Sequence, residues 1–145
     1  MENRIEILRN MIDELIFSLK KEEQKYFFVH LYGVSHFCTL LARKRNLDVD
    51  ISTASGMLHD IYVVLTGTHK DHAEKGSLKS QEILEATNLF SQEEIKTITT
   101  AISRHSKKEL LHEPYDELLK DADVLHHCFY NDSFQVAEKE IKRYN

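Results

Sequence analysis

The stretch Ala54-Ser55-Gly56-Met57-Leu58-His59-Asp60-Ile61 is an apolar run that ends in an adjacent imidazole and carboxylate, and the rest of the chain is organised around it. A charged carboxylate buried beside a histidine is costly unless it is neutralised, and a divalent metal neutralises it directly. We therefore predict that His59 and Asp60 are metal ligands. An isolated His-Asp pair is more often a core histidine beside a turn residue, so this prediction depends on partners elsewhere in the chain.

The composition indicates a single helical domain. A chain of 145 residues, 41% hydrophobic and 30% charged, is large enough to bury a core without disulfides. It has one proline and four glycines, and no segment alternates valine, isoleucine and threonine as strands do. We predict an all-α fold in which residues 1–145 form one compact, single-domain bundle of about six or seven helices.

Charge and hydropathy exclude several classes of protein. The net charge of −5 argues against general nucleic-acid binding, which needs a basic surface. No apolar run approaches the roughly 20 residues of a membrane span, and residues 1–10 are too charged for a secretory signal, so we expect a cytoplasmic protein without a membrane partner. Cys38 and Cys128 are far apart, which argues against a disulfide framework or a thiolate zinc site. The sequence leaves open whether the chain forms a homodimer.

Apolar residues at three- and four-residue intervals predict the helices. The predicted helices cover residues 3–19 and 26–45, then run from Ala54 through Ile61, from His72 through Leu84, from Ser91 through Ile102, from Pro114 through Leu125, and from Asp132 to Tyr144. Asp50 or Ser52 is the expected cap of the third helix and Asp71 that of the fourth. The segment Ser91-Gln92-Glu93-Glu94 fits a capping box.

Further candidate ligands lie on predicted buried faces. His30 shares an apolar stripe with Val34, although on its own it would be assigned to the core. His105 extends the buried stripe of the helix before it. Asp123 lies on a mostly buried stripe, whereas Asp121 lies about 200° further round the helix, where a surface residue or a partner of a ligand is expected.

In order and surroundings these residues resemble the HD-domain metal-dependent phosphohydrolase superfamily, whose signature is a histidine, then a His-Asp pair, then a distant aspartate. The resemblance covers roughly residues 26–130. It implies a first metal ion held by His30, His59, Asp60 and Asp123. It implies a second ion held by His72 and His105 with Asp60 as the bridge. Many relatives have two consecutive histidines where this chain has His105-Ser106. Either His126 or His127 could approach the pocket, but we expect each to lie on the surface or to contact a ligand rather than the ion.

The implied ligand set mixes imidazole and carboxylate, which suits Mn, Fe, Co, Ni or Zn and, less well, Mg. The resemblance implies hydrolysis of a phosphate ester or anhydride of a small, nucleotide-like substrate by metal-activated water. We expect Asp60 to act in catalysis through one or two ions, with Lys75 and Arg104 as cationic helpers. The alternatives are a catalytically weak sensor that binds a metal and a nucleotide, and a helical bundle whose histidines are incidental.

Overall fold

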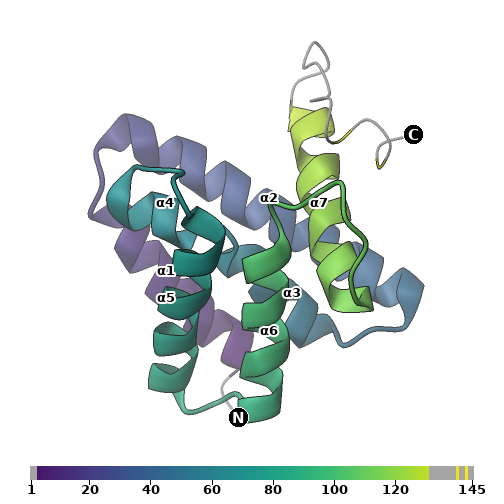
Figure 1. The fold of residues 1–145 in the computed structure, drawn as a ribbon. Helices are drawn as coiled ribbons and strands as arrows, with labels where there is room; N and C mark the ends of the chain where they lie inside the picture. The colour runs from purple at the N-terminus through teal and green to yellow at the C-terminus, as the bar shows by residue number, and fades with distance from the viewer. Residues whose placement is uncertain (1–2, 131–139, 141–142, 144–145) are drawn as a thin grey trace.

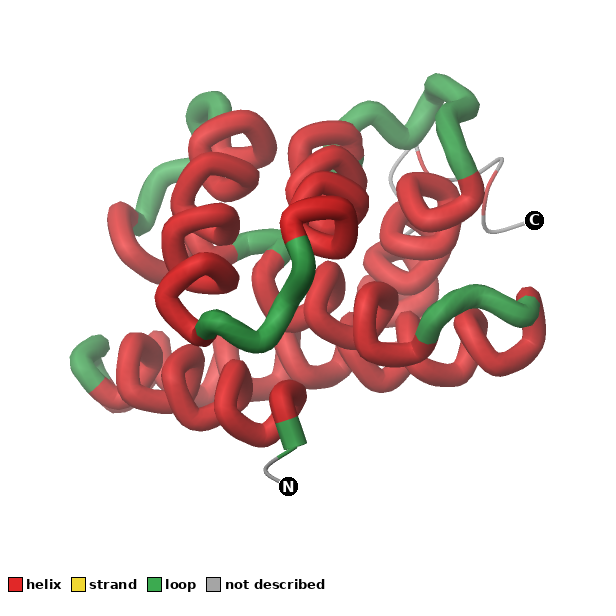
Figure 2. Tube along the Cα trace, turned by 90° about the horizontal axis from the view of Figure 1, so that it is seen from below, coloured by secondary structure: helices red, strands yellow, loops and turns green. Residues whose placement is uncertain are grey.

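The computed structural model describes residues 3–130, 140 and 143. These residues form seven α-helices and no strand (Figure 1 and Figure 2), as the sequence predicts. The helices are α1 (Arg4–Phe17), α2 (Lys21–Arg45), α3 (Val49–Leu58), α4 (Ile61–Thr66), α5 (His72–Thr87), α6 (Gln92–Arg104) and α7 (Pro114–Tyr130). None of these described helices combines the length and the apolar character that crossing a bilayer requires. Most of the predicted closing helix, residues 132–139, 141, 142 and 144, lies outside the described residues.

Helix α2, with 25 residues, packs against α1, α3 and α7. Its contact with α3 is close because Gly56 lies between the two helices. A Cβ at Gly56 would be 2.7 Å from the Cα of Ser35 and 2.9 Å from the Sγ of Cys38. A side chain at this position would force the helices apart. The placement of α3 on α2, and with it the position of His59 just beyond α3, therefore depends on Gly56.

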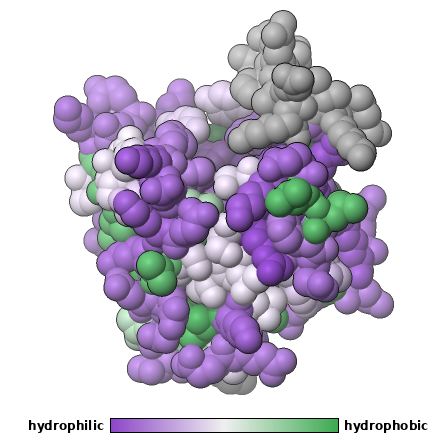
Figure 3. All heavy atoms as spheres, in the orientation of Figure 1, coloured by the Kyte–Doolittle hydropathy of each residue, from purple (hydrophilic) through white to green (hydrophobic). Residues whose placement is uncertain are grey.

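Helices α5 and α6 pack side by side (Figure 1), and α6 also packs against α3 and α7. Fully buried apolar side chains from all seven described helices form one core. They are Leu8, Ile12, Ile16, Leu31, Met57, Leu58, Ile61, Leu84, Ile98, Ile102 and Leu118. Each contributes roughly 1.5–3 kcal/mol through burial. The face drawn in Figure 3 is mainly polar, with apolar residues scattered over it. The core therefore fixes the positions of the helices relative to one another. Polar side chains near the helix ends are not needed for this core and can form a site.

The third helix ends earlier than predicted. Helix α3 ends at Leu58 and α4 begins at Ile61, and Asp60 between them has φ −113° and ψ 22°. On an uninterrupted helix the side chains of adjacent residues diverge by about 100°. The break lets His59 and Asp60 turn toward one space. The prediction of a continuous helix is thus wrong at the position where both side chains are needed together.

The predicted cap of α3 is wrong, and the predicted cap of α5 is correct in position but not in its hydrogen bond. Asp48, rather than Asp50 or Ser52, caps α3, since its side chain accepts a hydrogen bond from a backbone N–H at 3.0 Å. Asp71 precedes α5 with a φ of 54° and makes no side-chain cap hydrogen bond within the described part of the chain. Three nearby polar residues could each have capped α3, and only the backbone conformation distinguishes them.

Other helix starts are confirmed. Ser91 and Glu94 form the capping box of α6, and α7 begins at Pro114. The start of α2 is an exception, because this helix begins at Lys21 and not at the predicted residue 26. The guanidinium of Arg4 holds the capping-box glutamate through two bonds of 2.9 and 2.8 Å, which joins α1 to the start of α6. This bidentate pair lowers the pKa of Glu94 to about 2.

Candidate metal centre

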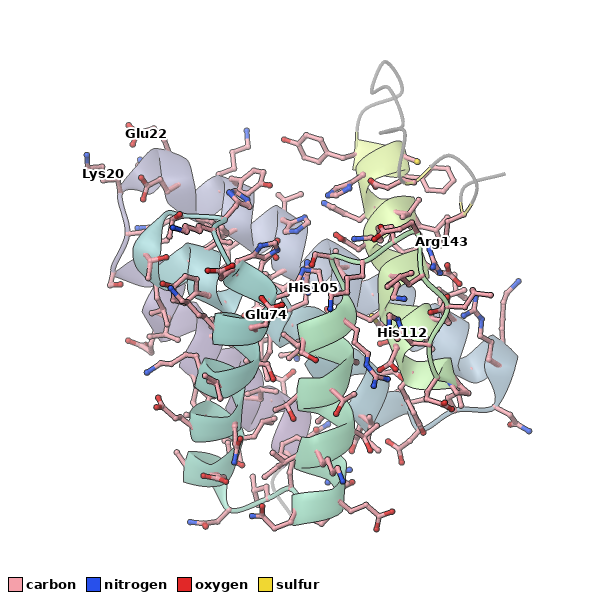
Figure 4. All side chains as sticks on the ribbon, viewed as in Figure 1. Lys20, Glu22, Glu74, His105, His112 and Arg143 are labelled. Carbon is pink, nitrogen blue, oxygen red and sulfur yellow. The ribbon has the colours of Figure 1, made fainter. Side chains whose placement is uncertain are left out.

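Six side chains from separate parts of the chain converge at one end of the bundle. They come from the middle of α2, the break between α3 and α4, the first residue of α5, the residue after α6 and the second half of α7. Figure 4 shows one of them, His105, at the upper end of α6. The structure thus brings together all six predicted ligands: His30, His59, Asp60, His72, His105 and Asp123.

One cluster forms around His30 and His59. Their Nε2 atoms lie 3.1 Å apart, and Oδ2 of Asp60 lies 2.9 Å from the first and 3.4 Å from the second. Oδ1 of Asp123 lies 3.8 Å from Nε2 of His30 and 3.5 Å from Nε2 of His59. Four donor atoms of the residue types that bind transition metals therefore face a common centre.

A second cluster forms around His72 and His105. Their Nε2 atoms lie 3.2 Å apart, and Oδ1 of Asp60 lies 3.6 Å from the first and 3.3 Å from the second. Asp60 therefore offers one carboxylate oxygen to each cluster. This is the arrangement that a bridging carboxylate has between two ions.

Backbone carbonyls fix the orientation of three of the rings. Nδ1 of His59 donates to the carbonyl of Gly56 at 2.7 Å, and Nδ1 of His105 donates to Ile102 at 2.7 Å. Nδ1 of His72 donates in the same way to the carbonyl of His69 at 2.8 Å. Because Nδ1 carries the hydrogen in each case, the neutral ring presents the unprotonated Nε2 to the cluster. This is the usual orientation of a metal-binding histidine.

Without a metal, two carboxylate oxygens of the clusters lack hydrogen-bond partners among the described residues. They are Oδ1 of Asp60 and Oδ1 of Asp123, and both are buried. A buried acceptor without a partner costs roughly 1–3 kcal/mol, and more when it is charged. Both oxygens, and the Nε2 atoms that face one another, point into the same space. A cation would satisfy all of them, so the residues fit a divalent metal.

The electrostatics of the clusters favour cation binding. Burial alone would lower the pKa of His59, but the carboxylates of Asp60 and Asp123 outweigh it and raise that pKa to about 10. Burial also opposes ionisation of the two carboxyl groups. The imidazoles around Asp60, and Lys108 with His59 around Asp123, nevertheless hold both pKa values well below the ordinary value. Burial lowers the pKa of His105, which keeps its ring neutral and able to donate a lone pair.

A cavity of about 150 Å³ opens beside the clusters. Its lining residues are Tyr26, His30, Asp60, His69, His72, His105, Ser106, Lys108, Asp123, His127 and Glu140. The ring of Tyr26 stacks on that of His30, with centroids 5.7 Å apart and planes 15° from parallel. The cavity therefore gives a small molecule access to the donor atoms of both clusters.

Lys108 is a site residue that the sequence analysis missed. Its Nζ is buried, lies 2.9 Å from Oδ2 of Asp123 and donates to the carbonyl of His105 at 2.7 Å. Lys108 lies in the connection between α6 and α7, where no periodic pattern marks a buried residue. Its position three residues after His105 is the one sequence signal that could have identified it.

The two predicted cationic helpers lie outside the cavity. The ammonium of Lys75 is exposed and lies over the ring of Tyr62, 5.5 Å from its centroid. The guanidinium of Arg104 binds Asp116 at 2.7 Å. Neither residue lines the cavity beside the clusters.

Asp121, the alternative to Asp123, faces away from the clusters and pairs with arginine side chains of α2 and of residue 143, each at 2.7 Å.

The sequence model of one family, described as HD domain, matches residues 27–127 and so includes all six converging side chains. No curated protein and no solved structure matches the chain.

Proposed function

The chain belongs to the HD-domain family, and from this premise we propose that it is a metal-dependent phosphohydrolase. Its substrate would be a phosphate ester or anhydride of a small, nucleotide-like molecule, cleaved by metal-activated water. One observation carries the proposal: Asp60 offers one oxygen to His30 and His59 and the other to His72 and His105. A carboxylate shared by two imidazole pairs is suited to two-metal hydrolysis of phosphate compounds.

The ligand residues define which ions fit. Four imidazoles and two carboxylates favour Mn, Fe, Co, Ni or Zn over Mg, which prefers oxygen ligands. Bound divalent ions would lower the pKa of a water and stabilise charge on the phosphoryl oxygens. The carbonyls that hold Nδ1 of His59, His72 and His105 keep these rings oriented.

Lys108 takes the cationic role in this proposal. Its ammonium is fixed at the cavity by Asp123 and by the carbonyl of His105, so it is already oriented before a substrate enters. A preorganised positive group stabilises charge that develops on phosphoryl oxygens. Tyr26, stacked on His30, keeps that ring in place and closes one side of the cavity.

A larger groove beside the cavity supports an organic group on the substrate. The groove has a volume of about 600 Å³ and shares Tyr26 and His69 with the cavity. The rest of its lining is mainly apolar, with carboxylates at one side, and comprises Leu19, Glu22, Glu23, Phe27, Val63, Val64, Leu65, Thr66 and Gly67. Its size is in the range of small-molecule sites, roughly 300–1,000 Å³. A nucleobase, with an apolar face and N–H donors at its edge, matches this lining.

The proposal is tested on the full chain without a histidine tag. Elemental analysis measures bound metal, and phosphate release is then assayed after reconstitution with each candidate ion against nucleoside mono-, di- and triphosphates and dinucleotides. Asp60→Asn should lose both metal and activity. Asp121→Asn makes the same chemical change outside the cavity and should retain both.

Two results would overturn the proposal. Metal and nucleotide binding without phosphate release in any combination would favour the sensor. Absence of both metal and nucleotide binding would show that the histidines are incidental to function.

A further inference from the structure

A seventh side chain reaches the first cluster from α7. His127 lines the cavity, and its Nε2 lies 3.5 Å from Oδ1 of Asp123, one helical turn earlier. This is the buried carboxylate oxygen that has no hydrogen-bond partner among the described residues. Nε2 of His30 lies 3.8 Å from the same oxygen. Asp123 therefore faces an imidazole nitrogen from α2 and another from its own helix.

Glu140 fixes the orientation of the His127 ring. Nδ1 of His127 lies 3.0 Å from Oε1 of Glu140, whose side chain is 4% exposed. The carboxylate accepts the Nδ1 hydrogen, so Nε2 of the neutral ring is directed to the cavity. The carbonyls behind His59, His72 and His105 have the same effect on those rings. A carboxylate behind a histidine is a common second partner of metal-binding imidazole.

The distances between these donor atoms are slightly longer than those of ligands that share an ion. Donor atoms bound to one ion at about 2.1 Å lie roughly 3.0–3.4 Å apart at octahedral and tetrahedral angles. The donor atoms of His30, Asp123 and His127 all lie within 4.8 Å of one another. The rings of His127 and His30 are stacked, parallel within 9° and with centroids 5.6 Å apart. A small contraction toward a cation would bring these atoms into coordination.

We infer that His127 is a protein ligand of the ion held by Asp123, and that Glu140 is its positioning residue. The inference rests on the metal site of the proposed function, but not on hydrolysis. His127 would hold this ion together with His30 and Asp123, the residues with which its donor atom forms one set. An ion held by His72, His105 and Asp60 would have fewer protein ligands and would be the better place for water and substrate.

The test is a Co(II) titration of the metal-stripped full chain, followed by visible absorption and by competition with a chelator. Co(II) absorption reports ligand number and type, independently of turnover. His127→Ala should weaken Co(II) binding at the site of Asp123 by about a hundredfold and change the Co(II) spectrum. Glu140→Gln should weaken Co(II) binding at this site by about tenfold. His36→Ala, which removes an exposed histidine of α2, should leave both readings unchanged.

Folding is checked separately by circular dichroism and melting temperature, and His127→Gln provides a variant of similar size. Wild-type affinity and spectrum in folded His127→Ala and His127→Gln would overturn the inference. If these variants lose phosphate release with an unaltered Co(II) spectrum, His127 contacts the substrate instead. Failure of the proposed function is distinct, since it would appear as an inactive wild type regardless of these spectra.

Discussion

The carbonyl oxygen of Gly56 accepts a hydrogen bond of 2.7 Å from Nδ1 of His59, in the last turn of α3. The same glycine lets α3 approach α2, since a Cβ would lie 2.7 Å from the Cα of Ser35. One residue thus sets both the distance between two helices and the orientation of the candidate ligand that follows one of them.

Gly56→Ala should therefore reduce both stability and metal affinity. Overpacking at a close helix contact costs typically 1–3 kcal/mol, about 2 kcal/mol here, and the shift of α3 would move His59 away from His30. Denaturant unfolding and chelator competition measure the two effects. Gly76→Ala is the matched control, because a Cβ there meets its nearest neighbours at 3.7–3.8 Å. In helix α5 that change should be neutral or stabilising by up to about 1 kcal/mol. Equal effects of the two substitutions would contradict the role of Gly56.

Metal binding should release protons at neutral pH. The carboxylates of Asp60 and Asp123 overcome burial and raise the pKa of His59 from 6.5 to about 10, so this ring is protonated at pH 7 and must lose its proton to bind an ion. Apparent metal affinity should rise with pH between 6.5 and 10. Calorimetry in buffers of different ionisation enthalpy measures the released protons. An affinity that does not change over this range would refute the prediction.

Stability of the metal-stripped protein should change in the opposite direction. A folded pKa above the unfolded one means that the folded state binds the proton more tightly. The contribution of His59 is then fully present below pH 6.5 and is lost as pH rises toward 10. Unfolding by denaturant at several pH values tests this for the wild type. The His59→Gln variant should lack this component of the pH dependence.

Lys108→Met should lower kcat/KM for phosphate release by about 10²–10³-fold if the ammonium stabilises phosphoryl charge. The exposed neighbour Lys107 supplies the control, and Lys107→Met should keep the wild-type rate. Inhibition by inorganic phosphate gives an independent reading, because loss of the ammonium should weaken it. A folded Lys108→Met enzyme with unchanged kcat/KM and unchanged phosphate inhibition would show that Lys108 only neutralises Asp123.

Filling the groove should impair large substrates more than small ones. Leu65 is 40% exposed and lines the groove. Leu65→Trp should lower kcat/KM for nucleotides by about tenfold or more, corresponding to the roughly 1–3 kcal/mol that a small change in an apolar pocket supplies, and spare p-nitrophenyl phosphate. Leu78→Trp adds the same ring at an exposed position of α5 outside the groove and should affect neither. A parallel loss for both substrates would place the organic group elsewhere.

Helical periodicity placed three of the converging side chains on buried faces, and the resemblance to the HD-domain family supplied the rest of the predicted ligand set. His30, His105 and Asp123 lie on apolar stripes, and a polar residue on such a stripe must face a buried partner. The all-α class followed from the same pattern, and it is confirmed. What periodicity could not supply was the break at Asp60, since Ile61 continues the apolar spacing across it.

Ion pairs between residues that are distant in sequence also could not be predicted from the sequence. Lys75 and Arg104 were chosen because they flank ligands along the chain, but neighbours on a helix point in different directions. Arg104 instead binds Asp116 of α7. Lys108 reaches the site from a connection without a pattern, and the carboxylate that neutralises its buried ammonium, Asp123, is distant in sequence.

Asp60 has a further consequence for how the centre would fill. A single negative charge that serves two cations cannot donate fully to both, so the first ion to arrive draws electron density away from the second. If two ions bind, their occupancy would then be anticooperative, and each ion would weaken the other by the same factor. A wild-type titration should accordingly resolve into two steps, with a half-loaded species at intermediate concentrations.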